Sequence, residues 1–125
     1  MKLRIRGNQV RIRIQQKELA LLHSNGVLED KTEFPEGVLL CRVRTSDRVN
    51  RLEAHFENSC VELIVPIELV NGWYASDEVS LTGETQTLKL LLEKDFYCLK
   101  SRSVWKEDES DAFPNPHSSC GENHG

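Results

Sequence analysis

The chain has 125 residues, of which 29% are charged, and its formal net charge is −4. This size fits a single domain over residues 1–125 that folds around its own core without a disulfide framework. The longest apolar runs, LIVPI at 63–67 and LLL at 90–92, are too short to span a bilayer. Because the start MKLRIRGNQVRIRI alternates basic and apolar residues, it does not resemble a secretory signal, and we predict a cytoplasmic protein, most simply a bacterial one.

The first fourteen residues predict a β-hairpin. KLRIR at 2–6 and VRIRI at 10–14 alternate basic with apolar residues, which places the two kinds on opposite faces of a strand. GNQ at 7–9 has the composition of a turn. We therefore expect two antiparallel strands with one apolar and one basic face.

A short helix and a second pair of strands follow this hairpin. Leu19, Leu22 and His23 share a helical face in QQKELALLHSNG, and Asn25-Gly26 is typical of a helix C-terminus. The next expected elements are a strand at 27–34, a turn at 35–37, a strand at 38–44 and a loop at 45–50.

The same pattern recurs 51 residues later. Ala54 and Phe56 take the places of Leu3 and Ile5, ENS at 57–59 replaces GNQ, and the offset continues without a gap to 88–95. PIELVNGWYAS at 66–76 then supplies the second helix, with Pro66 in its first turn. We predict an α+β fold of mainly antiparallel strands, in a curved sheet or open barrel with two short helices. The half-repeats 3–44 and 54–95 match in pattern, so duplication of a ββαββ unit and chance similarity both stay open.

Charge is unevenly distributed along the chain. Residues 1–52 carry 11 Lys and Arg against 6 acids, and residues 53–125 carry 5 against 14. Strand positions hold a set of arginines that could bind a phosphate or nucleotide ligand: Arg4, Arg6, Arg11, Arg13, Arg42 and Arg44. The favoured alternative is internal neutralisation, because His55, Glu57 and Glu62 stand where the repeat places Arg4, Arg6 and Arg11, and the acidic tail could also cover them. Nucleic acid is disfavoured as a partner, because stacking aromatics do not accompany these arginines.

The last part of the chain contains a candidate zinc site. Cys98, His117, Cys120 and His124 supply the two thiols and two imidazoles of a tetrahedral site, so zinc is the one cofactor that the sequence suggests. The spacing lacks a CxxC pair. A Cys-His hydrolase is disfavoured because the acids at 107–111 would raise the pKa of a nearby thiol, and we assign no catalytic residue.

The segment DAFPNPH suggests a C-terminal clasp over residues 96–125. Phe113 is costly to leave in water, and Pro114 and Pro116 stiffen the chain around it. We expect these three residues to dock in an apolar groove of the domain. The alternative is a free linear motif that presents the same element to a partner.

Four motifs resemble an uncharacterised bacterial family of small proteins of unknown function: MKLRIRGNQVRIR, VPIELVNGWYASDEV, EKDFYCL and DAFPNP. The resemblance implies no activity, but it implies that the tail belongs to the protein. Our first hypothesis is a cytoplasmic accessory or binding protein without catalysis, a monomer or homodimer with a protein partner and no membrane contact. The alternatives are zinc binding by the C-terminal residues and recognition of a phosphorylated ligand by the basic strands.

Overall fold

The computed structural model describes residues 1–96 and 111–114. Two strands, a helix and two strands follow one another along the chain, and the same order then recurs. The first set is β1 (Lys2–Arg6), β2 (Gln9–Ile14), α1 (Gln16–Asn25), β3 (Val27–Phe34) and β4 (Gly37–Ser46). The second set is β5 (Glu53–Glu57), β6 (Cys60–Pro66), α2 (Ile67–Tyr74), β7 (Ser80–Thr85) and β8 (Leu88–Lys94). The predicted α+β fold with two short helices is confirmed.

Tight turns close the first hairpin of each set. Gly7 has a φ of 54°, and Asn58 and Ser59 have φ angles of 52° and 59°. Positive φ angles are typical of two-residue hairpin turns whose twist matches that of the flanking strands. The hairpins predicted around GNQ and ENS are therefore present, as β1–β2 and β5–β6.

The strands form two four-stranded sheets, and each sheet takes one hairpin from each half of the chain. The first sheet has the order β1-β2-β8-β7 and the second has the order β3-β4-β6-β5. The inner pairs β2–β8 and β4–β6 are parallel, and the other neighbours are antiparallel. The strands of the two halves thus follow the same order along the chain. Each half contributes one hairpin to the first sheet and one to the second.

The strand register differs from the gapless alignment of the two halves. Val10 lies opposite Leu90 in the first sheet, and the equivalent Val61 lies opposite Cys41 in the second. By strand pairing, Cys41 therefore corresponds to Leu90. The uninterrupted offset of the sequence would instead pair Cys41 with Leu92. Strand pairing thus relates Cys41 and Leu90 by an offset of 49 residues, while duplication of the half-repeats stays a prediction.

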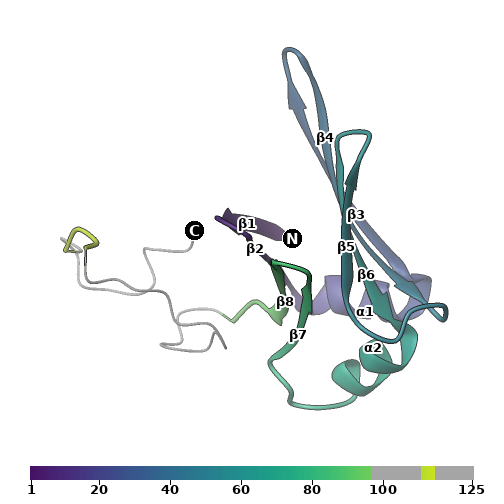
Figure 1. Cartoon of the computed structure of the whole chain (residues 1–125). Helices are drawn as coiled ribbons and strands as arrows, with labels where there is room; N and C mark the ends of the chain where they lie inside the picture. Colours follow the sequence, from purple (N-terminus) through teal and green to yellow (C-terminus); the bar gives the residue numbers. More distant parts are fainter. Residues whose placement is uncertain (97–110, 115–125) are drawn as a thin grey trace.

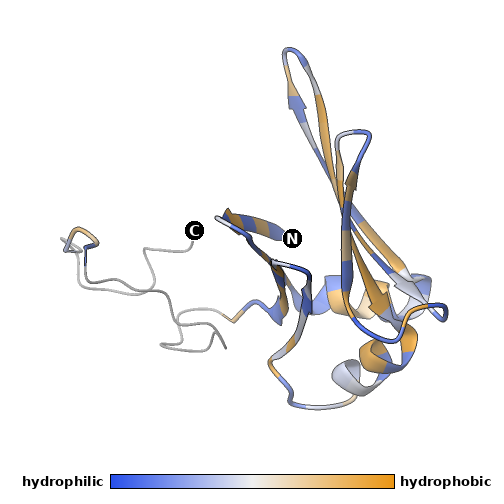
Figure 2. Ribbon diagram, in the orientation of Figure 1, coloured by the Kyte–Doolittle hydropathy of each residue, from blue (hydrophilic) through white to orange (hydrophobic). Residues whose placement is uncertain are grey.

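The two sheets face each other, and the helices close one end of the space between them (Figure 1). The core joins side chains from both sheets and both helices, including Cys41. Its fully buried members include Ile12, Leu22, Val43, Leu63, Val65, Val70, Trp73, Leu90 and Leu92. In Figure 2 apolar residues alternate with polar ones along the strands and continue toward the hairpins at the other end.

The edges of the two sheets meet along two seams. At the first seam, between β5 and β7, a Cβ atom added to Gly83 would lie 2.8 Å from the Cβ atom of Leu52. At the second, the amino group of Met1 donates hydrogen bonds to Glu18 on α1 and Asp30 on β3. Burial lowers the pKa of this amino group, but the two carboxylates outweigh it and raise that pKa overall.

Local signals set the ends of the helices. A reciprocal pair of hydrogen bonds between Gln15 and Glu18 begins α1, and Gly26, with a φ of 80°, ends it. Pro66 directly precedes α2, as expected. The rings of His23 and Tyr74 stack at a centroid distance of 4.2 Å, which joins the two helices.

Candidate binding surface

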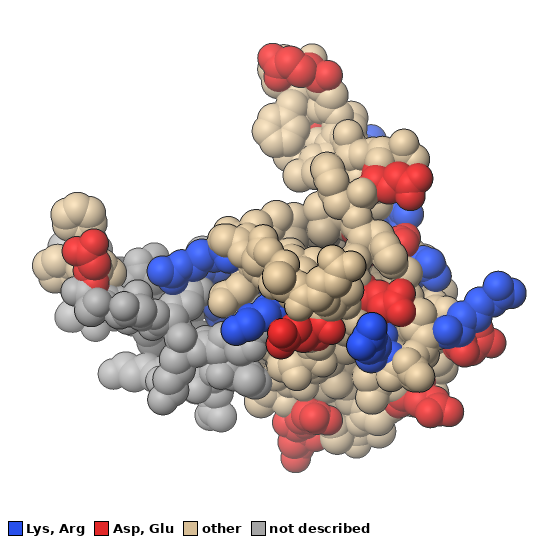
Figure 3. Space-filling model, viewed as in Figure 1, with Lys and Arg blue, Asp and Glu red and all other residues tan. Residues whose placement is uncertain are grey.

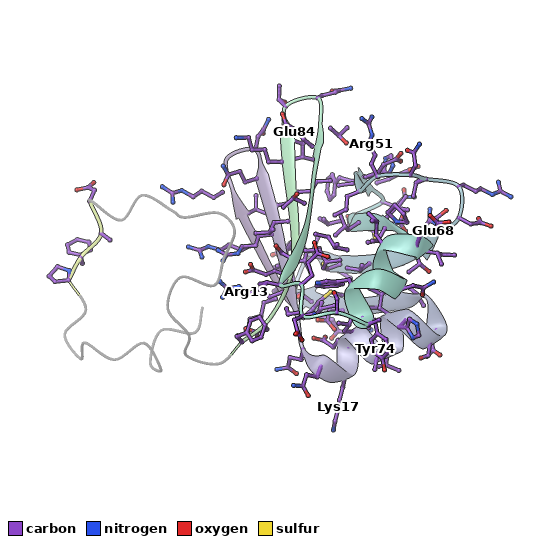
Figure 4. All side chains as sticks on the ribbon, turned by 90° about the horizontal axis from the view of Figure 1, so that it is seen from below. Arg13, Lys17, Arg51, Glu68, Tyr74 and Glu84 are labelled. Carbon is purple, nitrogen blue, oxygen red and sulfur yellow. The ribbon has the colours of Figure 1, made fainter. Side chains whose placement is uncertain are left out.

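The outer face of the first sheet carries a buried charge cluster. We call outer the face of each sheet that points away from the core. The Nε atoms of Arg11 and Arg13 on β2 donate to the same carboxylate oxygen of Glu93 on β8, at 2.8 and 2.7 Å. Arg13 and Glu93 are neighbours in the parallel register. Figure 4 shows Arg13 on the side of this sheet away from the helices.

The second sheet carries a similar cluster nearer to solvent. Glu62 on β6 accepts from Arg42 at 3.1 Å and lies 3.2 Å from Arg44, both on β4, and Arg42 also contacts Glu29 at 2.8 Å. Burial acts to raise the pKa of Glu62, but the hydrogen bond from Arg42 and the charge of Arg44 lower that pKa overall.

The six arginines predicted to form an anion site lie on two different sheets. Arg11, Arg13, Arg42 and Arg44 face carboxylates within the domain, while Arg4 and Arg6 are exposed on β1 and also have partners. Glu62, one of the acids expected to neutralise them, contacts Arg42 and Arg44 on β4, while Glu93 contacts Arg11 and Arg13. Binding of a phosphorylated ligand stays a prediction.

The predicted zinc ligands Cys98, His117, Cys120 and His124 lie outside the described residues. Within residues 1–96 and 111–114 no cluster of three or more His, Cys, Asp or Glu side chains could hold a metal ion. The two described cysteines are buried and unpaired, and burial raises the pKa of the Cys41 thiol to about 11. Cys41 therefore presents no reactive thiolate at neutral pH.

The predicted docking of the tail can be followed only in part. Phe113 is 97% exposed, which is not the packed position expected for it, and Pro114 is exposed as well. Pro116 lies outside the described residues. Docking of these three residues in an apolar groove stays a prediction.

An apolar surface that the sequence analysis did not find lies at the hairpin end of the domain, opposite the helices. Ile5 and Phe56 follow the partly buried Leu3 and Ala54 at strand spacing, and Phe34 ends β3 on the same face as the buried Leu28. The side chains of Ile5, Phe34 and Phe56 are 58%, 54% and 72% exposed. They belong to the inner faces of both sheets, beyond the point where these faces pack together. We call these three residues the apolar end surface.

The surroundings of the apolar end surface are acidic on the second sheet. Glu33 and Glu36 flank the end of the β3–β4 hairpin, and Glu57 ends β5; all three are exposed. In Figure 3 acidic atoms occupy the tip of the projecting hairpin, and uncharged atoms fill much of the surface below it. The border is therefore acidic beside Phe34 and Phe56, whereas Arg4 and Arg6 flank Ile5 on the first sheet.

The sequence contained a signal for this surface. Ile5 and Phe56 are the last residues but one of the strands that lead into the hairpin turns, and Phe34 sits directly before the turn at Pro35. Apolar residues at strand ends extend past the core whenever strands are longer than the layer that they cover. The alternation of Ile5 and Phe56 is the same as that of core positions, so alternation alone did not reveal that these strands extend past the core.

Comparison with protein-family models matches residues 1–117 to DUF7009, a family of unknown function. The chain belongs to this family. The DUF7009 match covers both sheets and extends through Phe113, Pro114 and Pro116, which confirms the expected membership of an uncharacterised family. Comparisons with curated proteins and with solved structures found no match. Neither described helix of this DUF7009 protein is long and apolar enough to cross a membrane.

Proposed function

We propose that this DUF7009 protein is a binding protein that holds an apolar segment of a partner protein on its apolar end surface. The observation that carries the proposal is the exposure of Ile5, Phe34 and Phe56, each near the hairpin end of its strand. Burying one such side chain contributes about 1.5–3 kcal/mol. Three of them can offset much of the entropic cost of association, so a dissociation constant near about 10 μM is expected.

Charge defines the partner further. Glu33, Glu36 and Glu57 border the apolar end surface, and like charges on a partner would repel them. An apolar segment flanked by Lys or Arg is therefore the matching occupant. This pattern also adds specificity, because a segment flanked by acids would lose affinity.

A cytoplasmic accessory role without catalysis is part of this proposal. It is supported by the buried unpaired thiols of Cys41 and Cys60, which fit a reducing compartment, and by the pairing of the strand arginines with carboxylates inside the domain. The bacterial origin suggested by the sequence belongs to the same proposal.

The proposal can be tested with two synthetic peptides that share a core of alternating valine and phenylalanine. One has lysine flanks and the other has glutamate flanks, and binding of each labelled peptide is followed by fluorescence anisotropy. The lysine-flanked peptide should bind, and the double variant Phe34→Ser/Phe56→Ser should weaken its binding at least about tenfold. Val38→Ser is the matched control, because Val38 is exposed on the outer face of the same β3–β4 hairpin.

Two outcomes would overturn the proposal. Equal binding of both peptides, or binding that survives the double variant, would show that the apolar end surface is not the recognition site. If sedimentation instead shows a dimer that Phe34→Ser/Phe56→Ser dissociates, the occupant is a second copy of the chain and not a basic partner segment.

A further inference from the structure

The outer faces of the two sheets differ in the sign of their charge. On the strands of the first sheet, six cations and two acids occupy outer positions: Lys2, Arg4, Arg6, Arg11, Arg13, Lys89, Glu84 and Glu93. On the strands of the second sheet, three cations and five acids do so: Lys31, Arg42, Arg44, Glu29, Glu33, Glu53, Glu57 and Glu62. The first sheet therefore has a basic outer face, and the second sheet has a mildly acidic one.

An arginine pair lies near the middle of the basic face. Arg4 on β1 is directly opposite Arg11 on β2 in the antiparallel register. Like charges at directly opposite positions destabilise a sheet. Glu93 contacts Arg11 but also contacts Arg13, so its single negative charge serves two arginines. An anion bound on this face would offset the repulsion.

One row of outer positions crosses the first sheet at its hairpin end. The row contains Arg6 at the end of β1, Gln9 at the start of β2 and Lys89 on β8, which are neighbours in the register. Neighbouring strands lie about 4.8 Å apart, so the row spans roughly 10 Å. Arg6 and Lys89 are exposed, and Gln9 is half-buried between them. All three side chains donate hydrogen bonds.

Hydrogen bonds join the two hairpins that carry this row. The backbone N–H group of Lys89 donates to the carbonyl oxygen of Asn8 at 2.9 Å. The side-chain amide of Asn8 donates to the hydroxyl group of Thr87 at 2.9 Å. These bonds connect the β1–β2 turn to the β7–β8 hairpin and fix the backbone beneath the row. A preorganised set of donors binds a ligand at a lower entropic cost.

The equivalent row of the second sheet has different chemistry. The strand register places Glu57, Cys60 and Leu40 at the positions of Arg6, Gln9 and Lys89, so an acid, a thiol and a leucine replace two cations and an amide. Because the two sheets share their connectivity, the fold itself does not require donors at these positions. The row of donors is therefore specific to the first sheet.

We propose that Arg6, Gln9 and Lys89, with Arg4 beside them, bind an oligophosphate, a small ligand with two or more linked phosphate groups. Arg4 lies two residues before Arg6, so both point to the outer face about 7 Å apart. A phosphate monoester carries about −1.5 to −2 charges at neutral pH, so two phosphate groups balance the three exposed cations. Arginine binds phosphate oxygens in bidentate geometry. Arg4 and Arg6 also have partners within the chain, and the five N–H groups of a guanidinium allow further contacts.

The same face disfavours nucleic acid as the ligand. The outer positions of β1, β2, β7 and β8 hold no aromatic side chain, so these four strands offer no platform on which bases could stack. Recognition therefore depends on the phosphate groups. This site lies on an outer face, whereas the apolar end surface belongs to the inner faces, so the two proposals can fail independently.

Isothermal titration calorimetry of the full chain with sodium tripolyphosphate tests the site. Tripolyphosphate should bind more tightly than inorganic phosphate, because one phosphate group cannot balance the row. The double variant Arg6→Gln/Lys89→Gln should weaken tripolyphosphate binding at least about tenfold, since two charged donors are lost. The matched control is Lys31→Gln/Arg48→Gln, which removes the same charges from exposed positions on β3 and in the loop between β4 and β5. Its affinity should stay within about twofold of the parent, because screening weakens distant charges.

A further variant tests the opposite direction. Glu84 on β7 is the outer-face neighbour of Lys89 and places an acid at the end of the row. Glu84→Gln should therefore tighten tripolyphosphate binding, by about two- to threefold. Lys89→Arg keeps the charge and should retain binding. Since Arg6 and Lys89 are exposed, the double variant should keep the urea midpoint of the parent.

Four results would overturn the proposal. The first is the absence of tripolyphosphate binding. The second is an equal loss in Arg6→Gln/Lys89→Gln and in its control, because net charge alone would then attract the ligand. The third is binding of inorganic phosphate as tight as that of tripolyphosphate. The fourth is tighter binding of a single-stranded oligonucleotide that the double variant abolishes, because the ligand would then be a nucleic acid.

Discussion

The two sheets of this DUF7009 protein build the same kind of charge cluster from opposite strands. Glu93 on β8 holds Arg11 and Arg13 on β2, whereas Glu62 on β6 holds Arg42 and Arg44 on β4. By the strand register Arg11 on β2 corresponds to Glu62 on β6. The arginines and the glutamate thus stand on exchanged strands in the two sheets, and ion pairs join the strands in both. The comparison teaches that either strand of the parallel pair can carry the glutamate, with two arginines on the neighbouring strand facing it. What differs is burial, which makes the first cluster important for folding and leaves the second close to solvent.

The largest expected effect breaks the buried cluster. Glu93→Gln removes the charge that balances Arg11, so unfolding free energy should fall by about 3 to 4 kcal/mol. Glu62→Gln in the exposed cluster should cost about 1 kcal/mol. Urea unfolding followed by tryptophan fluorescence measures both. Equal losses would contradict the difference between the two sheets.

A second prediction concerns Leu91, which is buried on the outer face of β8. Leu91→Ala removes a fully buried side chain, and we expect a loss of about 2 to 3 kcal/mol in unfolding free energy. Leu40→Ala on the outer face of β4 is the matched control, because Leu40 is only half-buried. Its loss should be below about 1.5 kcal/mol. The same urea titrations compare the two, and a Leu40 loss as large as that of Leu91 would refute the account.

The seams between the sheets give a third prediction. Gly83→Ala puts a methyl group 2.8 Å from the Cβ atom of Leu52, which forces the β5–β7 seam apart and should cost about 2 kcal/mol. Gly37→Ala is the control, since nothing lies within 4 Å of the position of its added Cβ. Thermal unfolding should show a clear drop for the first variant and little change for the second. A Gly83→Ala protein as stable as the parent would show that the seam is loose.

The smallest expected effect is a dependence on pH. The folded pKa of Glu62 lies below its ordinary value of 4.5, so its ion pairs stabilise the fold above that value and lose this contribution as the pH falls through the folded pKa. The difference in unfolding free energy between the parent and Glu62→Gln should therefore shrink from about 1 kcal/mol at pH 7 toward zero as the pH falls below 4.5 and through the folded pKa. Urea unfolding across this range measures it. A difference that grows on acidification would have the wrong sign.

Much of the secondary structure was predictable because its causes are local. Alternation marked β1 and β2, the Asn25-Gly26 pair marked the end of α1, and Pro66 marked the start of α2. The exchange of hairpins between the halves was not predictable in this way. It depends on pairing β2 with β8, residues about 80 positions apart, and no local pattern specifies which strands meet over such distances.

The site was less accessible from the sequence for a related reason. The arginines and the acids could be listed, but only the parallel register brings Glu93 to Arg13 and Glu62 to Arg42. Ile5 and Phe56 have the alternation of core residues, and their exposure depends on how far the two sheets remain packed together. That distance is a tertiary property, which strand periodicity alone does not contain.

The most direct test of the account is to map the surface that binds the lysine-flanked peptide. Chemical-shift changes in ¹⁵N-labelled full-length protein during titration would identify that surface. The account predicts changes around Ile5, Phe34 and Phe56 at the hairpin end, with little change on the outer face of the first sheet. Changes concentrated instead at Arg11, Leu91 and Glu93 would contradict it, because they would show that this face is free to bind a partner and that the hairpin end is not the recognition surface.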